Sequence, residues 1–237
     1  MNILAVGANP DDVELLCSGT LALYSKRGDN IHICYISNGD KGGNGEAPES
    51  VAKTRAMESR QAGALINAKL YPLNIPDGEV CVSLELRRKL VSVIRQTKAD
   101  VIITHSDNDY MSDHNCTSTL VMDAAFWSAV AEFKGDPDNS ALGSHAPKVV
   151  YQMETVAGIG FAPEEYVDIT DVIDLKIGML SSHKSQVRYM MERDGLDFVD
   201  CMITTAKYRG YQCGVKYAEG FVRVKKYPFL TTNRLLP

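Results

Sequence analysis

Short apolar runs alternate along the chain with longer segments in which apolar residues recur at intervals of three and four. Many of the short runs are rich in β-branched residues, which is typical of buried strands, and the longer segments have the period of amphipathic helices. These patterns predict strands over 3–6, 31–36, 69–73, 99–104, 148–153 and 220–224 with a short one near Tyr166. They predict helices over 13–23, 49–66, 84–97, 116–133 and from Thr170 or Asp171 through Leu180 to 183–186.

The alternation of strands and helices predicts an α/β fold with a mostly parallel sheet that is covered by helices on both faces. The length of 237 residues suits a single domain over 1–237, and the sequence contains no internal repeat, low-complexity segment or domain boundary. A polar loop is expected at 135–140, whereas the pattern over 190–214 is less regular.

Two adjacent carboxylates follow the first predicted strand. Asp11 and Asp12 stand where that strand ends and the first helix begins, which is where open α/β sheets place ligand sites. Aspartate is also a favoured helix cap, because it stabilises the positive end of the helix dipole. Taken alone, the pair is therefore explained equally well by a ligand site or by capping.

A second group of polar side chains follows the strand predicted over 99–104. His105, Asp109, Tyr110, Asp113 and His114 all belong to one predicted loop at its carboxyl end. A single histidine is usually structural, but turn chemistry does not explain so many ionisable groups together. Because parallel strands place their carboxyl ends at one edge of the sheet, this group and the Asp-Asp pair indicate a shared chemical site.

Composition narrows the function classes. Hydrophobic residues make up 45% and charged residues 23%, as in soluble globular proteins. The net charge of −5 and the lack of a basic block argue against nucleic acid or an anionic membrane as partner. We expect a cytoplasmic protein, because no apolar run reaches the ~20 residues of a membrane span and the amino terminus does not resemble a signal peptide. The six cysteines form no Cys-x-x-Cys pair, which favours reduced, structural cysteines over disulfides or a thiolate metal site. The lack of a Gly-x-Gly-x-x-Gly motif argues against a dinucleotide site, and the lack of Gly-x-Ser-x-Gly argues against a serine hydrolase with a nucleophile elbow.

Two motifs carry a resemblance to a known family. Asn-Pro-Asp-Asp-Val-Glu at 9–14, with Gly-Thr-Leu-Ala at 19–22, resembles the opening His-Pro-Asp-Asp signature of the PIG-L/LmbE-like zinc de-N-acetylases. Asn-Asp-Tyr-Met-Ser-Asp-His at 108–114 resembles their Asn-Asp-Tyr-His-Pro-Asp-His motif. The resemblance spans nearly the whole chain and implies a Rossmann-like three-layer sandwich. It also implies that Asp12 and His114 bind zinc and that Asp11 is the general base.

The chain departs from the family at two positions of these motifs. Asn9 stands where the family has a zinc-binding histidine, and Met111 stands where it has a histidine that acts as an acid or stabilises the oxyanion. A neutral amide oxygen suits zinc poorly. Three alternatives follow: weaker metal binding through Asn9, Asp12, His114 and water; recruitment of His105 as a substitute ligand; or loss of the metal. A replacement introduced at position 9 to trap a substrate would also explain Asn9.

Further roles follow from the resemblance alone. Tyr110, His105 or an arginine would stabilise the oxyanion in place of the missing histidine. Asp40, Arg55 and Asp77 match positions that contact the substrate, with Met111 beside them, although each also has a simpler interpretation: a surface loop for Asp40, a helical ion pair with Glu58 for Arg55, and a Pro-Asp-Gly turn for Asp77.

The segment 154–161, with its two glycines, is expected to line the pocket. His-Lys-Ser-Gln at 183–186 also resembles a His-x-Ser-Gln segment of the family, and His183 is either a packed helix-end residue, which we favour, or a residue near the pocket.

These observations predict a metal-dependent hydrolase that removes an N-acetyl group from a GlcNAc-type amino sugar or glycoconjugate. Zinc would polarise the acetyl carbonyl while a free carboxylate accepts a proton. Two alternatives remain: a non-catalytic homologue that binds a sugar, and a metal-free enzyme with Asp11 as base. The resemblance also implies self-association into a homo-oligomer.

Overall fold

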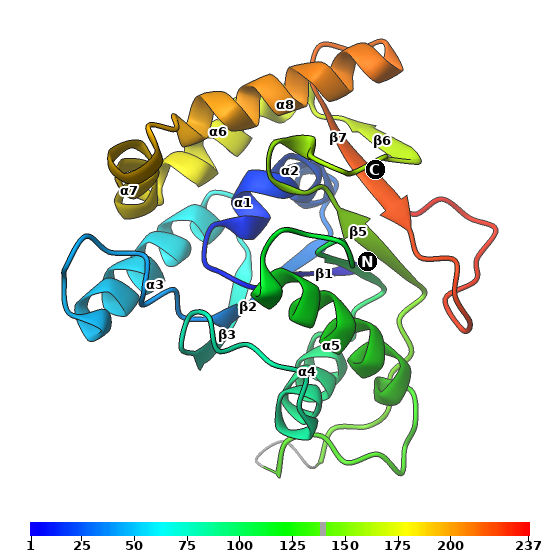
Figure 1. Ribbon diagram of the computed structural model, residues 1–237. Coiled ribbons are helices and arrows are strands. Elements are labelled where there is room, and N and C mark those ends of the chain that lie inside the picture. The colour runs from blue at the N-terminus through cyan, green and yellow to red at the C-terminus, as the bar shows by residue number, and fades with distance from the viewer. Residues whose placement is uncertain (138–140) are drawn as a thin grey trace.

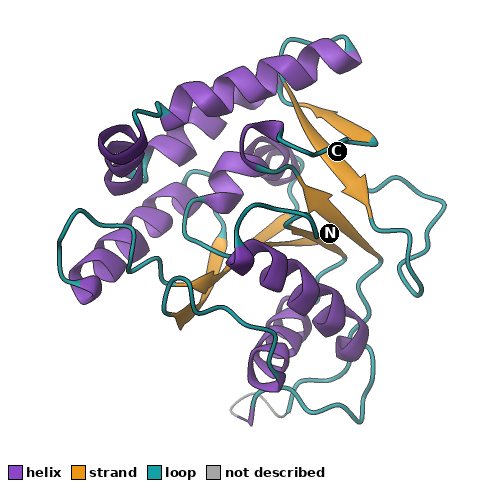
Figure 2. Cartoon of the chain, in the orientation of Figure 1, coloured by secondary structure: helices purple, strands orange, loops and turns teal. Residues whose placement is uncertain are grey.

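The structure of the chain, a computed structural model, describes residues 1–137 and 141–237 (Figure 1). The end of the polar loop predicted at 135–140 therefore lies outside the described residues. The described part of the chain folds into one seven-stranded sheet with helices on both faces, as Figure 2 shows. The predicted α/β, three-layer, mostly parallel architecture is confirmed.

The sheet has the strand order β3-β2-β1-β4-β5-β7-β6. The five strands from β3 to β5 pair in parallel, and β7 runs antiparallel to both of its neighbours. The first connections step outward from β1 to β3, and the chain then returns to place β4 on the other side of β1. The strands are β1 Asn2–Gly7, β2 Asn30–Ser37, β3 Lys69–Ile75, β4 Val101–Thr104, β5 Val149–Met153, β6 Glu165–Asp168 and β7 Ala218–Arg223.

Helices cover the two faces of the sheet unequally. On one face α4 and α5 pack against each other and against a core that includes Leu4 and Ile102. The other face buries Ile3 and Ile103 under α1, α2, α6 and α8 (Figure 1). The helices are α1 Asp12–Leu16, α2 Ser18–Lys26, α3 Pro48–Ala64, α4 Leu84–Thr97, α5 Ser112–Ser128, α6 Ile173–Ser181, α7 Lys184–Asp194 and α8 Phe198–Cys213, with 3-10 turns at Val156–Gly158 and Thr170–Val172.

Local sequence explains the clearest elements. All four residues of β4 are buried, as expected of an apolar strand covered on both faces. Helix α4 has the bounds predicted from its apolar period. It begins after Ser83, whose side chain accepts a hydrogen bond from the Leu86 amide at 3.2 Å, and ends at Lys98 in the left-handed conformation.

The structure corrects the prediction in several places. The first helix is broken at Cys17, whose φ of −142° is not helical, so that α1 and α2 are separate. Helix α5 begins at Ser112, four residues before the predicted start, and therefore includes His114. The helix predicted to run to 183–186 ends at Ser181, a separate helix α7 begins at Lys184, and the less regular segment 190–214 is largely helical, in α7 and α8. Gln186 is the one buried residue of α7, so that helix has no apolar stripe from which to predict it.

The described helices include none that is both long and apolar enough to span a membrane.

Candidate metal and hydrolase site

The two polar groups predicted from the sequence meet at the carboxyl ends of β1 and β4, which are neighbours in the sheet. The chain leaves β1 toward β2 on one side, while β4 lies on the other, so this is the point where the strand order reverses. Ligands bind at such switch points in open α/β sheets, because the loops on either side diverge and leave a crevice. Asp11 and Asp12 follow β1, and His105 follows β4.

Asp12 lies between two histidines. Its Oδ1 is 3.4 Å from His114 Nε2, and its Oδ2 is 3.1 Å from His105 Nε2. The two imidazole rings stack with their centroids 4.1 Å apart. Burial alone would raise the pKa of Asp12, but the adjacent histidines outweigh it and hold that pKa well below its ordinary value. Asp12 is therefore ionised and able to bind a cation.

The loop before α5 and the first turn of that helix orient His114. Its Nδ1 lies 3.1 Å from Asp109 Oδ1, which leaves Nε2 directed at Asp12. Burial on its own would lower the pKa of His114, but Asp12 and Asp109 raise it to about 10, so a metal bound at Nε2 would have to displace a proton. A carboxylate behind a histidine is the usual outer-shell arrangement of metal sites, because it fixes the tautomer and the ring orientation.

These residues fit a divalent metal. The candidate ligand atoms of Asp12, His105 and His114 all lie within 4.8 Å of one another. Tetrahedral zinc with bonds near 2.0–2.1 Å places its ligand atoms roughly 3.3 Å apart, and the Asp12 contacts have this spacing. His105 is engaged elsewhere as well, since its Nε2 accepts the Ala8 amide at 3.0 Å, so it would bind a metal in competition with that hydrogen bond.

Neighbouring side chains occupy the amide nitrogen of Asn9. Its amide nitrogen donates to Ser37 Oγ at 2.7 Å and to Asp77 Oδ1 at 2.6 Å, while its main-chain N–H donates to Asp12 Oδ2 at 2.6 Å. Both side-chain donors are thus used, and only the amide oxygen remains as an atom that could bind a metal. Asn9 also ties the turn after β3, which contains Asp77, to the end of β1.

Asp11 lies beside the metal-binding group without belonging to it. It has a φ of 130°, which is strained for a residue other than glycine and is characteristic of functional sites. Arg55 holds it in place, because Nη2 donates to Asp11 Oδ2 at 3.1 Å and to the Pro10 carbonyl at 2.5 Å, while Nη1 donates to the Gly39 carbonyl. Burial, opposed by Arg55 and reinforced by Asp12, raises the Asp11 pKa to about 7.

A cavity of about 330 Å³ opens in front of this group. The predicted residues that line it are Asn9, Asp11, Asp12, Arg55, Asp77, Tyr110, Met111 and His114. Two others lie elsewhere. His105 is completely buried behind Asp12. Asp40 accepts the Asp77 amide through Oδ1 at 2.9 Å and lines a separate groove of about 690 Å³ along α3 and β3.

The far wall of the cavity contains Val156, from the segment 154–161 that was expected to line the pocket, and otherwise residues that the sequence analysis did not identify. These others come from α7 and α8, and α7 lacks the periodicity that predicts a helix. The His-x-Ser-Gln segment at 183–186 was the one signal near α7: Gln186 lines the cavity, while His183 is buried with Nε2 3.5 Å from Glu14 Oε1. The additional lining residues are Val156, Gln186, Tyr189, Met190, Arg193 and Phe198.

Comparisons with known proteins identify the family and the fold. The sequence profile of the family described as PIG-L, GlcNAc-PI de-N-acetylase, matches residues 4–125. Diacetylchitobiose deacetylase of Thermococcus kodakarensis is 24% identical over 92% of this chain and 81% of its own length. The 4-oxalmesaconate hydratase of Pseudomonas putida is 23% identical over 97% of this chain and 91% of its own length. The crystal structure of N,N'-diacetylchitobiose deacetylase from Pyrococcus horikoshii shares the fold, with a TM-score of 0.81, 24% identity and coverage of 94% of this chain and 83% of that one.

Proposed function

Because this chain belongs to the PIG-L family of de-N-acetylases, we propose that it is a metal-dependent hydrolase that removes the N-acetyl group from a GlcNAc-type amino sugar. One observation carries the proposal: a separate, buried carboxylate, Asp11, lies beside the Asp12 and His114 pair at the base of a cavity. Amide hydrolysis needs this division of labour, with one acidic group to hold the metal and another to accept a proton.

In this proposal Asp12 and His114 hold the metal, and either His105 Nε2 or the Asn9 amide oxygen completes the ligand set. The bound metal supplies Lewis-acid chemistry by polarising the acetyl carbonyl. Asp11 accepts the proton of the attacking water. Its pKa of about 7 suits this role, since a general base works best when its pKa lies near the working pH.

Tyr110 takes the place of the absent histidine at position 111. It lines the cavity, and its ring meets His114 edge to face with the centroids 5.5 Å apart. Tyr110 is 77% exposed, and a tyrosine hydroxyl is protonated at neutral pH, so it can donate a hydrogen bond to a developing oxyanion. Met111 has no proton to give and serves as an apolar wall.

The substrate class is inferred from the polar rim and from the relatives. Asp77 lines the cavity, and its carboxylate is an acceptor of the kind that the hydroxyls of a sugar require. Two of the relatives are named for diacetylchitobiose, a disaccharide of N-acetylated sugars. The volume of about 330 Å³ is at the lower end of the range for small-molecule pockets and suits one or two sugar rings.

The test combines metal content with turnover. The native protein and an Asn9→His variant are purified, their divalent metals are measured by elemental analysis, and acetate release from N,N'-diacetylchitobiose is followed. We expect weakly held metal and slow turnover in the native protein, and about one tightly held zinc in the variant, because imidazole is the better ligand.

An Asp11→Asn variant serves as the catalytic control. It should bind metal as the parent does and lose about 10²–10⁴-fold in kcat, the usual contribution of a general base. Turnover that survives complete chelation would support a metal-free enzyme with Asp11 as base. Sugar binding without any acetate release, in native protein and variant alike, would overturn the hydrolase proposal in favour of a binding protein.

A further inference from the structure

The break between α1 and α2 lies directly behind the candidate site. Helix α1 begins at Asp12, ends five residues later at Leu16, and is separated from α2 by the non-helical Cys17. A helix this short is not stable by itself, because the free-energy cost of nucleation is larger than the stabilisation from its few hydrogen bonds. The break also leaves carbonyls at the end of α1 and amides at the start of α2 without helical partners.

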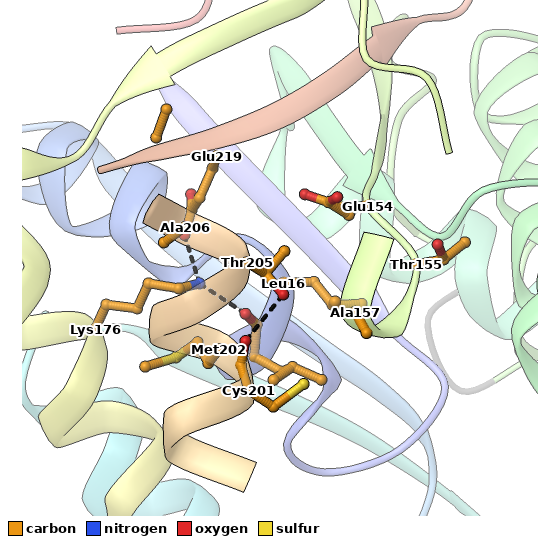
Figure 3. A pocket seen from close by; sticks show the side chains of 12 residues that line it. Leu16, Glu154, Thr155, Ala157, Lys176, Cys201, Met202, Thr205, Ala206 and Glu219 are labelled. Carbon is orange, nitrogen blue, oxygen red and sulfur yellow. Dashed lines mark hydrogen bonds and ion pairs between the residues drawn. The ribbon is translucent and has the colours of Figure 1, made fainter. Parts of the chain in front are cut away.

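One buried ion pair supplies partners on both sides of the break, beside Ser18, whose Oγ donates to the Glu14 carbonyl at 2.6 Å. Lys176, from α6, donates through Nζ to the Leu15 carbonyl at 2.7 Å and lies 3.4 Å from the Glu14 carbonyl. Glu219, from β7, accepts the Gly19 and Thr20 amides at 2.8 Å each. Lys176 Nζ and Glu219 Oε1 are themselves 2.6 Å apart, and Figure 3 shows the lysine side chain directed at Glu219.

The charges match the helix dipoles at the break. A cation is favourable at the carboxyl end of α1, and an anion is favourable at the amino end of α2. Both side chains are 2–3% exposed, so their interaction is not weakened by solvent. Gly19 makes the approach of Glu219 feasible, because a β-carbon there would lie 2.9 Å from Glu219 Oε1 and 2.9 Å from Ile169 Cγ2.

We propose that the Lys176–Glu219 pair is a positioning device that fixes α1 against α2 and thereby sets the direction of Asp12 toward His114. Neither residue lines the cavity in front of Asp12, so they act through the backbone of α1. The consequence for metal binding rests on the proposed function, whereas the consequence for the rigidity of α1 does not.

The test removes both charges together, because deleting one partner would leave the other buried and unpaired. In the Lys176→Met/Glu219→Gln double variant, methionine keeps the length of the lysine stem and glutamine keeps one acceptor oxygen. The matched control is Arg209→Met/Glu154→Gln, which removes a second buried ion pair, 2.6 Å from Nε to Oε1, on α8 and after β5.

Hydrogen exchange is measured for the amides of residues 12–16, zinc affinity by competition with a chelator, and Tm by calorimetry. We expect both double variants to lower Tm. Faster exchange in α1 and a zinc Kd raised about 10-fold or more, the usual effect of outer-shell changes, should appear only in the Lys176/Glu219 variant. Equal exchange and equal zinc affinity in the two double variants would overturn the proposal.

A milder pair of variants applies if the double variants do not fold. Gly19→Ala pushes Glu219 away from α2, whereas Gly178→Ala on α6 would meet nothing closer than Leu65 Cδ1 at 3.5 Å. Exchange in α1 should accelerate in the first and not in the second, and no difference between them would overturn the proposal. If the parent protein binds no metal, the proposed function fails, while the exchange measurement still decides the positioning role.

Discussion

Asp109 shows how much a single side chain behind the site can contribute. It does not line the cavity, yet it lies 3.1 Å from His114 Nδ1 and so decides which nitrogen of that ring faces Asp12. The loop that contains it is fixed from both ends, because the Asp109 amide donates to Asn115 Oδ1 at 2.8 Å and the Asn115 amide nitrogen donates back to the Asp109 carbonyl. The orientation of His114 therefore depends on a carboxylate that has no direct contact with the cavity.

Replacing Asp109 by asparagine should weaken metal binding while leaving the proposed ligands in place. We expect a zinc Kd about 10–100-fold higher, because the ring of His114 loses the charge that fixes its tautomer and raises its basicity. The control is Asp107→Asn, an exposed aspartate of the same loop that lies 3.9 Å from Lys226. Equal affinities in the two variants, measured by chelator competition, would contradict the role of Asp109.

At the scale of elements, the loop after β2 connects the polar rim to Arg55 on α3. Gly39 has a φ of +65°, and a β-carbon there would lie 2.3–2.7 Å from the Arg55 guanidinium atoms. The guanidinium thus lies flat against the loop backbone, and the Gly39 carbonyl accepts its hydrogen bond at 3.0 Å. The loop and α3 therefore fix the position of Asp11 jointly, through Arg55, although neither is adjacent to Asp11 in the sequence.

Gly39→Ala should displace Arg55 and release Asp11. Gly45→Ala is the matched control, since Gly45 also has a positive φ, of +91°, but a β-carbon there meets nothing within 4 Å. Both variants incur the backbone cost of about 1–2 kcal/mol for a non-glycine residue in this conformation, so the difference between them isolates the contact with Arg55. We expect kcat on an N-acetylated sugar to fall at least tenfold more in Gly39→Ala, and a comparable fall in both would refute this arrangement.

The elements also show what could be predicted from the sequence. The strands and α4 were predictable because their apolar periods are strong, and the acidic pair and His114 because their motifs are short and local. Helix α7 was not predictable, because Gln186 is its one buried residue and it has no apolar period. Most of the far wall of the cavity was therefore missed, since α7 contributes most of its residues. The partners of the α1–α2 break were also missed, because Glu219 lies 200 residues from Gly19 and no local pattern links the two.

At the scale of the whole molecule, the residues of the proposed site and the residues that pack behind them come from different parts of the chain. The family profile covers residues 4–125, which contain the acidic pair, Arg55 and His114. Lys176 and Glu219 lie beyond that segment. So do β5, which covers the open edge of β4, and Tyr151 and Phe221 of the core on the α1 face. The segment that bears the motifs therefore lacks a large part of its own core.

A fragment of residues 1–125 should for this reason fail to fold cooperatively. It would expose the edge of β4 and the apolar underside of α1 and α2, and it would leave the polar groups at the Cys17 break without partners. We expect no near-ultraviolet circular dichroism signal and rapid proteolysis, where the full chain resists. Adding the separately produced fragment 126–237 should restore protection if the two halves reassemble the sheet between β4 and β5. A sharp thermal transition in the 1–125 fragment alone would show that the family-matched segment is an independent folding unit and that the carboxyl-terminal part is dispensable for the geometry of Asp12.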